Sequence, residues 1–214
     1  PEAIPALRFK NSLLPTISLR AAADYIGFAD TLLDADGLVR RLPLFATDGD
    51  ALQPAVSIAT YLAYLRLPSA SLDQVVFADD SGQVCLTEAR CIPIDEQGLW
   101  HINMSGMPGV SFPVLSFRDV VEGTADLSLI EDRVALIGLY RTTGAVDTYP
   151  VPVSAGAEMA GVEIQAHALA TLIEGSALRT QSAASALLML FLLSFGSAFV
   201  YGRLRWFLKP FVLL

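Results

Sequence analysis

The feature that most constrains this chain is a stretch near its C-terminus with no charged side chain. Residues 183–201 read AASALLMLFLLSFGSAFVY. An α-helix needs about 20 mainly apolar residues to cross the hydrocarbon layer of a bilayer. The sequence therefore predicts a transmembrane helix over residues 183–202, attached to a water-soluble type of domain formed by residues 1–180.

The basic residues around this segment predict its orientation. Arg203, Arg205 and Lys209 follow it, whereas only Arg179 lies close before it. Lys and Arg next to a membrane helix are retained on the cytoplasmic side. The N-terminal domain is therefore expected outside the cytoplasm, periplasmic or extracellular, in a protein of the cell inner membrane.

The charge is divided unevenly along the chain. All 22 acidic residues and 11 of the 14 basic residues lie before residue 183, which gives this part a formal net charge of −11. Binding of nucleic acid requires a basic face. Nucleic acid is therefore excluded as an expected partner, while the membrane is included.

The ends of the sequence suggest a piece of a longer protein. The chain begins with Pro1 rather than Met and ends within a second apolar run, residues 206–214. This run comes after the predicted membrane helix and a short basic connection. We interpret it as the truncated start of a further transmembrane helix.

Two cysteines stand six positions apart, at Cys85 and Cys91. This spacing suits two residues that face each other across a β-hairpin, and an extracytoplasmic compartment permits a disulfide. Two free thiols are the equally weighted alternative, because spacing alone does not fix the geometry. A metal site is disfavoured, since no further Cys or nearby His completes a ligand set.

The rest of the N-terminal part predicts an α/β domain with a mixed sheet, flanking helices and β-hairpins. Residues 25–32 and 38–45 are expected to pair as strands around the turn 34–37, whose Asp and Gly residues suit a tight turn. Apolar residues at helical spacing predict a helix over residues 54–65. Short strands are expected at 74–77, 84–86, 90–94 and 99–103.

Three elements are expected in the second half of this domain. Ser116 and Asp119 have the spacing of a capping box for a helix over 117–122, which Gly123 would close. Residues 134–138, VALIG, are apolar on both faces, as in a central and parallel strand. A further amphipathic helix carries Val162, Ala166, Leu169, Ala170 and Ile173 on one face and ends at Gly175.

The candidate ligand site is derived from this topology. In α/β folds ligands bind beyond the carboxyl ends of parallel strands, and the strand 134–138 would lead directly into a polar loop. An ordinary polar connection is the alternative. The candidate ligand-binding residues are Tyr140, Arg141, Thr142, Thr143 and Asp147 from this loop, and His167 from the next helix.

Other residue clusters are better explained as structural. Asp34 and Asp36 lack the further acidic residues of a calcium loop, so a turn is favoured. Arg40 and Arg41 would point to opposite faces of a strand, and at least one is expected to pair with an acid. His101 is interpreted as a structural residue of a strand.

The sequence also lacks the motifs of common enzyme classes. A nucleophile elbow, a phosphate-binding loop, an H-E-x-x-H zinc pair and a C-x-x-C redox pair are all absent. No catalytic residue, metal or cofactor is predicted, and the chain is not expected to be an enzyme.

Five segments follow one another in a recognisable order along nearly the whole chain. They are Gly27-Phe28-Ala29-Asp30 with residues 34–41, residues 92–98, Phe112-Pro113 with residues 116–120, residues 134–138, and residues 161–168. Together and in this order they resemble a known family, the type 2 CHASE domain, which is an extracytoplasmic sensor. The family commonly has His and Asn where this chain has Gln165 and His167, and a small Ala-Thr-Ala-like segment in place of residues 139–142, so its ligand is expected to differ.

The resemblance implies a receptor whose sensor passes a cue through the membrane to a cytosolic output. Outputs in such proteins are adenylate or guanylate cyclases, histidine kinases and Ser/Thr kinases, and a cyclase is the first expectation here. A homodimer and an extracytoplasmic ligand or protein partner are expected with it. A structural ectodomain that organises a membrane assembly and a tethered hydrolase are the alternatives.

Overall fold

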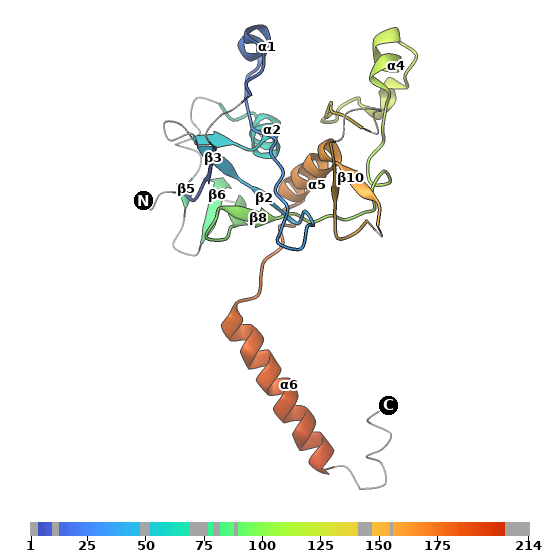
Figure 1. Ribbon diagram of the computed structural model, residues 1–214. Coiled ribbons are helices and arrows are strands. Elements are labelled where there is room, and N and C mark those ends of the chain that lie inside the picture. The colour runs from blue at the N-terminus through green and yellow to red at the C-terminus, as the bar shows by residue number, and fades with distance from the viewer. Residues whose placement is uncertain are drawn as a thin grey trace. The chain divides into compact units, whose positions relative to one another are not determined.

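The computed structural model describes residues 4–9, 13–47, 52–68, 77–78, 82–87, 90–140, 147–154 and 156–203. The chain divides into two compact units, Pro1–Leu178 and Arg179–Leu214. The first unit contains the described strands, which form small sheets, together with the helices that cover them (Figure 1). The predicted α/β class is confirmed.

The strands are short. A mixed three-stranded sheet has the order β1-β3-β4, an antiparallel sheet has the order β5-β6-β7, and β2 pairs with β8 and β9 with β10. Their bounds are β1 Leu7–Arg8, β2 Arg41–Pro43, β3 Phe45–Thr47, β4 Leu52–Pro54, β5 Phe77–Ala78, β6 Gln83–Thr87, β7 Arg90–Pro93, β8 Leu99–His101, β9 Thr148–Pro150 and β10 Glu158–Ala160.

The turn at residues 34–37 forms as predicted, but its two arms do not pair with each other. The amide of Gly37, which has a φ of 79°, donates to the carbonyl of Asp34, and the amide of Asp34 donates to the carbonyl of Leu38. β2 instead pairs with β8, opposite Trp100, and Phe28 forms an isolated bridge with Ala55. Pairing with distant strands puts Leu42 and Trp100 into the core, which a local hairpin would not do.

The core lies between the sheets and two helices, α2 (Val56–Tyr64) and α5 (Gly161–Glu174), which pack against each other (Figure 1). Both helices are predicted by their apolar spacing. α2 begins at Val56, so Pro54 ends β4 instead of occupying the first helical turn. The largest fully buried side chains come from both helices and the sheets, among them Trp100, Phe45, Leu42, Ile58, Met159, Ile164 and Leu172.

α4 (Phe117–Glu122) and α1 (Ile17–Ala22) bury none of their residues. α4 ends at Gly123 with a φ of 71°, as expected, and a short 3-10 helix spans Leu127–Leu129. The predicted capping box is wrong, because the side chain of the N-cap residue Ser116 makes no capping hydrogen bond.

The predicted central strand at residues 134–138 is also wrong. These residues have no regular secondary structure, and Val134 and Ile137 are 42% and 80% exposed. Gly138 packs against Val162 at the start of α5, where a Cβ would overlap the valine side chain. The segment therefore passes over the first turn of α5. Its apolar side chains are not buried on two faces, as those of a central strand would be.

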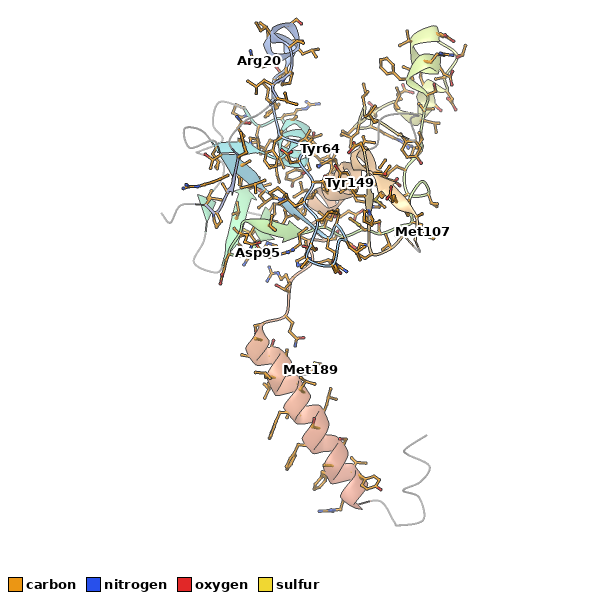
Figure 2. All side chains as sticks on the ribbon, in the orientation of Figure 1. Arg20, Tyr64, Asp95, Met107, Tyr149 and Met189 are labelled. Carbon is orange, nitrogen blue, oxygen red and sulfur yellow. A yellow bond between two sulfur atoms is a disulfide. The ribbon has the colours of Figure 1, made fainter. Side chains whose placement is uncertain are left out.

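α6 (Ala183–Arg203) makes up most of the described part of the second unit, which begins at Arg179. Its 21 residues are long and apolar enough to cross a membrane, and none of the helix is buried. Its side chains, including Met189, are exposed along its whole length (Figure 2). The expected membrane segment at residues 206–214 lies outside the described residues.

Candidate functional site

The start of α5 is held by Asp147. The amide of Gly161 donates to the backbone carbonyl of Asp147 at 2.9 Å, and the Asp147 carboxylate lies against the Cα of Gly161, where any Cβ would overlap it. A carboxylate at a helix N-terminus interacts favourably with the helix dipole. Asp147 therefore fixes where α5 begins.

Tyr149, on β9, interacts with Asp147 at this end of the helix (Figure 2). Burial raises the pKa of the Tyr149 phenol, and the negative charge and hydrogen bond of Asp147 raise the pKa further, against a smaller opposing effect of a hydrogen bond with Thr31. The phenol is thus kept protonated as a donor beside the carboxylate.

A row of polar side chains runs along one face of α5 in the interior. Glu163, His167 and Thr171 recur at intervals of four residues, and they are 7%, 0% and 1% exposed. Residues four apart lie one above the other on a helix. We call Glu163, His167 and Thr171 the polar row.

Residues 103–115, here called the strap, cover the polar row. The amide of Gly109 donates to Glu163 Oε1 at 2.8 Å, and the amide of Asn103 donates to Thr171 Oγ1 at 3.0 Å. Between them the Phe112 ring meets the His167 imidazole edge to face, with the ring centroids 4.9 Å apart. The strap contains neither helix nor strand, so these contacts to α5 hold it in place.

His167 is the most unusual member of the row. In the part of the chain that the structure describes, neither Nδ1 nor Nε2 has a hydrogen-bond partner, although the side chain is fully buried. Burial lowers the pKa of the imidazole below its usual 6.5. An unpartnered buried polar group costs free energy, so His167 is retained here at the expense of stability.

The other end of α5 is held by Arg90 of β7. Its Nη2 donates to the carbonyl oxygen of Ile173 at 3.1 Å, and its Nε donates to the hydroxyl of Tyr61 on α2 at 3.2 Å. The guanidinium lies where a side chain at Gly175 would be, and Gly175 takes a φ of 69° as the C-cap. A cation at the last carbonyls complements the helix dipole.

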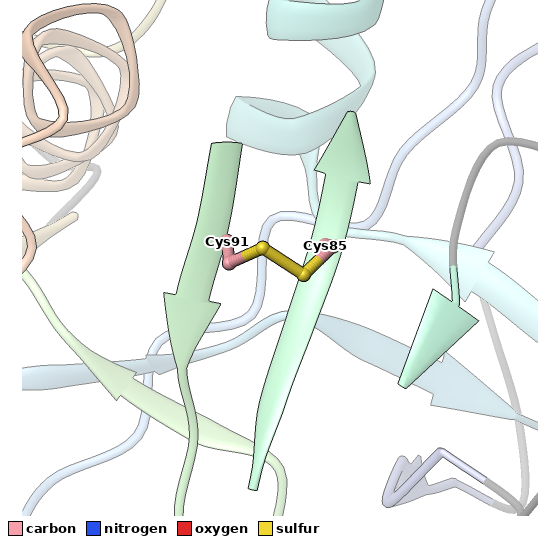
Figure 3. The surroundings of a disulfide bond; sticks show 2 residues. All are labelled: Cys85 and Cys91. Atoms are coloured by element: carbon pink, nitrogen blue, oxygen red, sulfur yellow. A yellow bond between two sulfur atoms is a disulfide. The ribbon is translucent and has the colours of Figure 1, made fainter. Parts of the chain in front are cut away.

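A disulfide joins β7, the strand that carries Arg90, to its neighbour β6. Cys85 of β6 and Cys91 of β7 are direct partners in the antiparallel register, and their sulfur atoms are bonded (Figure 3). This decides between the bridge and the free thiols left open by the sequence. A cavity of about 120 Å³ lies beside Cys91 and Arg90, lined also by Thr171, Gly175 and Ala177.

The acidic turn forms a separate charged cluster. Arg41 donates to Asp34 at 2.5 and 2.8 Å and to Asp95 at 2.6 Å, while Arg40 forms a two-pronged pair with Asp36 at 2.7 Å. The hydrogen bond with Arg40 lowers the pKa of Asp36 to about 2. Both arginines are thus paired with acids, as expected for at least one of them. In the described part of the chain, the carboxylates of Asp34 and Asp36 stabilise the turn and form no metal-binding loop.

The structure separates the predicted ligand residues into different places. Asp147 lies at the first turn of α5, whereas His167 comes six residues after Gly161, about 9 Å along the helix axis at 1.5 Å per residue. Tyr140 is half-buried at the end of the segment that crosses α5. Arg141, Thr142 and Thr143 lie outside the described residues, so that part of the predicted site stays a prediction.

Sequence reasoning missed Glu163, Thr171 and the strap. The signal was present, because Glu163, His167 and Thr171 recur at helical spacing. The buried face was instead assigned to apolar residues, but Val162, Ala166, Ala170 and Ile173 are only half-buried, and of the assigned residues Leu169 alone is buried. The polar row faces the interior alongside Ile164, Ala168 and Leu172.

The family model described as CHASE2 domain matches residues 3–199. Searches of the curated proteins and of the solved structures give no significant match. Since the family model spans most of the sequence, the chain belongs to the CHASE2 family, whose domains are extracellular sensors of signalling receptors.

Proposed function

We propose that this chain is the periplasmic sensor of an inner-membrane receptor and that it relays a cue through α5 and α6 to a cytosolic adenylate or guanylate cyclase. A homodimer is part of the proposal, since class III cyclases work as dimers. The observation that carries it is the position of α5, which is buried in the sensor and precedes the membrane-length helix α6 by only residues 175–182.

The contacts of α5 support a relay. Asp147 holds its first turn, the strap covers its middle and Arg90 holds its last turn. A sensor must have two states that differ in their affinity for the cue. A change in any of these three contacts would move α5 relative to the sheets, and the covalent connection transmits that movement to α6.

The basic residues that follow α6 support a cytosolic output. The last turn of α6 carries Arg203, and Arg205 and Lys209 come next in the sequence. Basic residues at this end favour its retention in the cytoplasm. We test this by attaching a membrane-impermeant label to single cysteines in intact cells, on a background without Cys85 and Cys91. Labelling at Ser105 with protection at Gly202 supports the orientation, and the reverse pattern contradicts it.

The relay is tested by lengthening the connection at Ser176 in the complete receptor. Residues 176–182 are not helical, so ten inserted Gly and Ser residues add a flexible link between α5 and α6. Cyclase activity is expected to lose its response to the cue, while the melting temperature of the sensor is unchanged. The same insertion after the exposed Ala23 is the matched control and leaves the response as in the parent chain. An unaltered response to the insertion at Ser176 would contradict the relay.

A further inference from the structure

The strap has no titratable side chain, whereas the polar row that it covers contains a histidine. Residues 103–115 read NMSGMPGVSFPVL and contain no titratable side chain. His167, which the strap covers through Phe112, is the one member of the row able to gain a charge between pH 5 and 8. Among the described residues, the closed arrangement offers an imidazolium no hydrogen-bond acceptor, and the side chain is closed off from solvent.

Among the titratable groups of the described residues, Glu163 is the one placed to pair with a protonated His167. On α2 the buried titratable group is Tyr61, whose hydroxyl accepts a hydrogen bond from Arg90. Arg90 lies at the last turn of α5 and Asp147 at its first turn, and Glu158 of β10 is bonded to Thr148. Glu163, one turn before His167 on the same face, carries the nearest carboxylate along the helix.

Glu163 lies between two possible partners. In the described state its Oε1 accepts from the Gly109 amide of the strap. A Glu four residues before a cation on a helix forms a favourable pair. If the Glu163 carboxylate rotates towards an imidazolium at position 167, its hydrogen bond with the Gly109 amide weakens. The strap then loses part of a contact when its cover over His167 becomes unfavourable.

We propose that the polar row is an acid-sensitive switch, in which proton uptake by His167 draws Glu163 away from Gly109 and releases the strap from α5. This inference rests on the proposed relay for its effect on the receptor output. The proton binds one imidazole nitrogen, and no bond between heavier atoms changes. The cue is a fall in extracytoplasmic pH, and no other small molecule is required.

The direction of the pH effect follows from the protonation of His167 in the closed and the open states of the strap. The closed state holds His167 neutral with its pKa below the usual 6.5, while the open state allows protonation. The closed strap is therefore fully favoured above about pH 6.5 and is lost progressively as the pH falls below that value. One proton taken up per opening changes the opening equilibrium about tenfold per pH unit within this range.

The test measures amide hydrogen exchange on this chain in lipid nanodiscs between pH 7.5 and 5. The reporters are the Gly109 and Asn103 amides, corrected for intrinsic exchange. The reference is the Ala59 amide of α2, which donates to the carbonyl of the N-cap residue Ala55. We expect their protection to fall about tenfold per pH unit below pH 6.5. Constant protection across this range would overturn the switch.

Variants separate the roles of the two residues. His167→Gln is expected to make the protection independent of pH, and Glu163→Gln is expected to weaken the dependence by removing the open-state pair. His101→Gln is the matched control for a histidine outside the row, and it leaves the response as in the parent chain. A full response in His167→Gln would overturn the proposal.

A spectroscopic measurement does not depend on the folding of His167→Gln. The chain contains two histidines, so two imidazole carbon signals are expected, and His101→Gln assigns them. Protonation of His167 must coincide in pH with the loss of Gly109 protection, and separate transitions would overturn the switch. If the strap opens but the receptor output does not respond, the relay is wrong and the switch stands.

Discussion

The two longest helices of the chain, α5 and α6, show that apolar composition and burial are separate properties. α5 contains Glu163, Gln165, His167 and Thr171, yet all four are buried. α6 is almost wholly apolar, yet its Leu and Phe side chains remain more than half exposed. The difference lies in the partners, because sheets, α2 and the strap cover α5, whereas α6 is uncovered and is long and apolar enough for a lipid bilayer.

The largest expected effect is on the free energy of unfolding, when the same Leu-to-Ala substitution is made in each of the two helices. Leu172→Ala in α5 removes a side chain that is 1% exposed and is expected to lower the free energy of unfolding by about 2–5 kcal/mol, from lost burial and the cavity left behind. Leu190→Ala in α6, where the leucine is 61% exposed, is the matched control. Urea unfolding of the sensor in detergent should change for the first variant only.

A charge in α6 tests the lipid side of the comparison. Leu190→Arg places a cation near the centre of the helix, which raises the cost of membrane insertion by about 2.5–3.5 kcal/mol. The share of chain in the carbonate-resistant membrane fraction should fall, while Leu190→Ile leaves it unchanged. Equal membrane shares for both variants would contradict a spanning role for α6.

The polar row predicts a smaller effect. Thr171→Val removes the hydroxyl that accepts from the Asn103 amide and donates to the His167 carbonyl at 2.7 Å. A buried amide left without its acceptor costs about 1–3 kcal/mol. Thr60 on α2 makes a similar 2.7 Å bond to the Val56 carbonyl of its own helix, so Thr60→Val should cost clearly less in the same urea experiment.

The smallest effect is expected at the exposed pair of Arg40 and Asp36. The pKa of Asp36 lies at about 2 in the folded chain, below its usual 3.8. The stabilisation is therefore present above pH 3.8 and is lost as the pH falls through 2. NMR titration should return the pKa of Asp36 towards its usual value in Arg40→Gln, and an unchanged pKa would exclude Arg40 as the cause.

Local signals in the sequence predicted part of this fold well. The turn at Asp34 and Gly37, the helical spacing of α2 and the glycine that ends α5 depend on residues close in the chain. α6 was likewise predictable from composition alone. These features need no knowledge of which distant segments meet.

Features that depend on distant partners were not predictable in the same way. Residues 134–138 have the composition of a buried strand, but strand formation requires a neighbour to accept and donate backbone hydrogen bonds. The pairing of β2 with β8 and the cover of the strap over His167 are likewise long-range. Glu163 and Thr171 were missed because their burial contradicts the ordinary preference of such residues for the surface.

The chain that leaves α5 carries a mechanical consequence. Before it reaches Arg179, its last described tie to the sensor is one antiparallel bridge, in which the amide of Leu178 donates to the His101 carbonyl at 3.4 Å. A pull from the membrane side would travel along the chain and meet this bridge before it reached the Arg90 contact at the end of α5. The bridge therefore ties the exit of the chain to β8, the strand that also carries the buried Trp100.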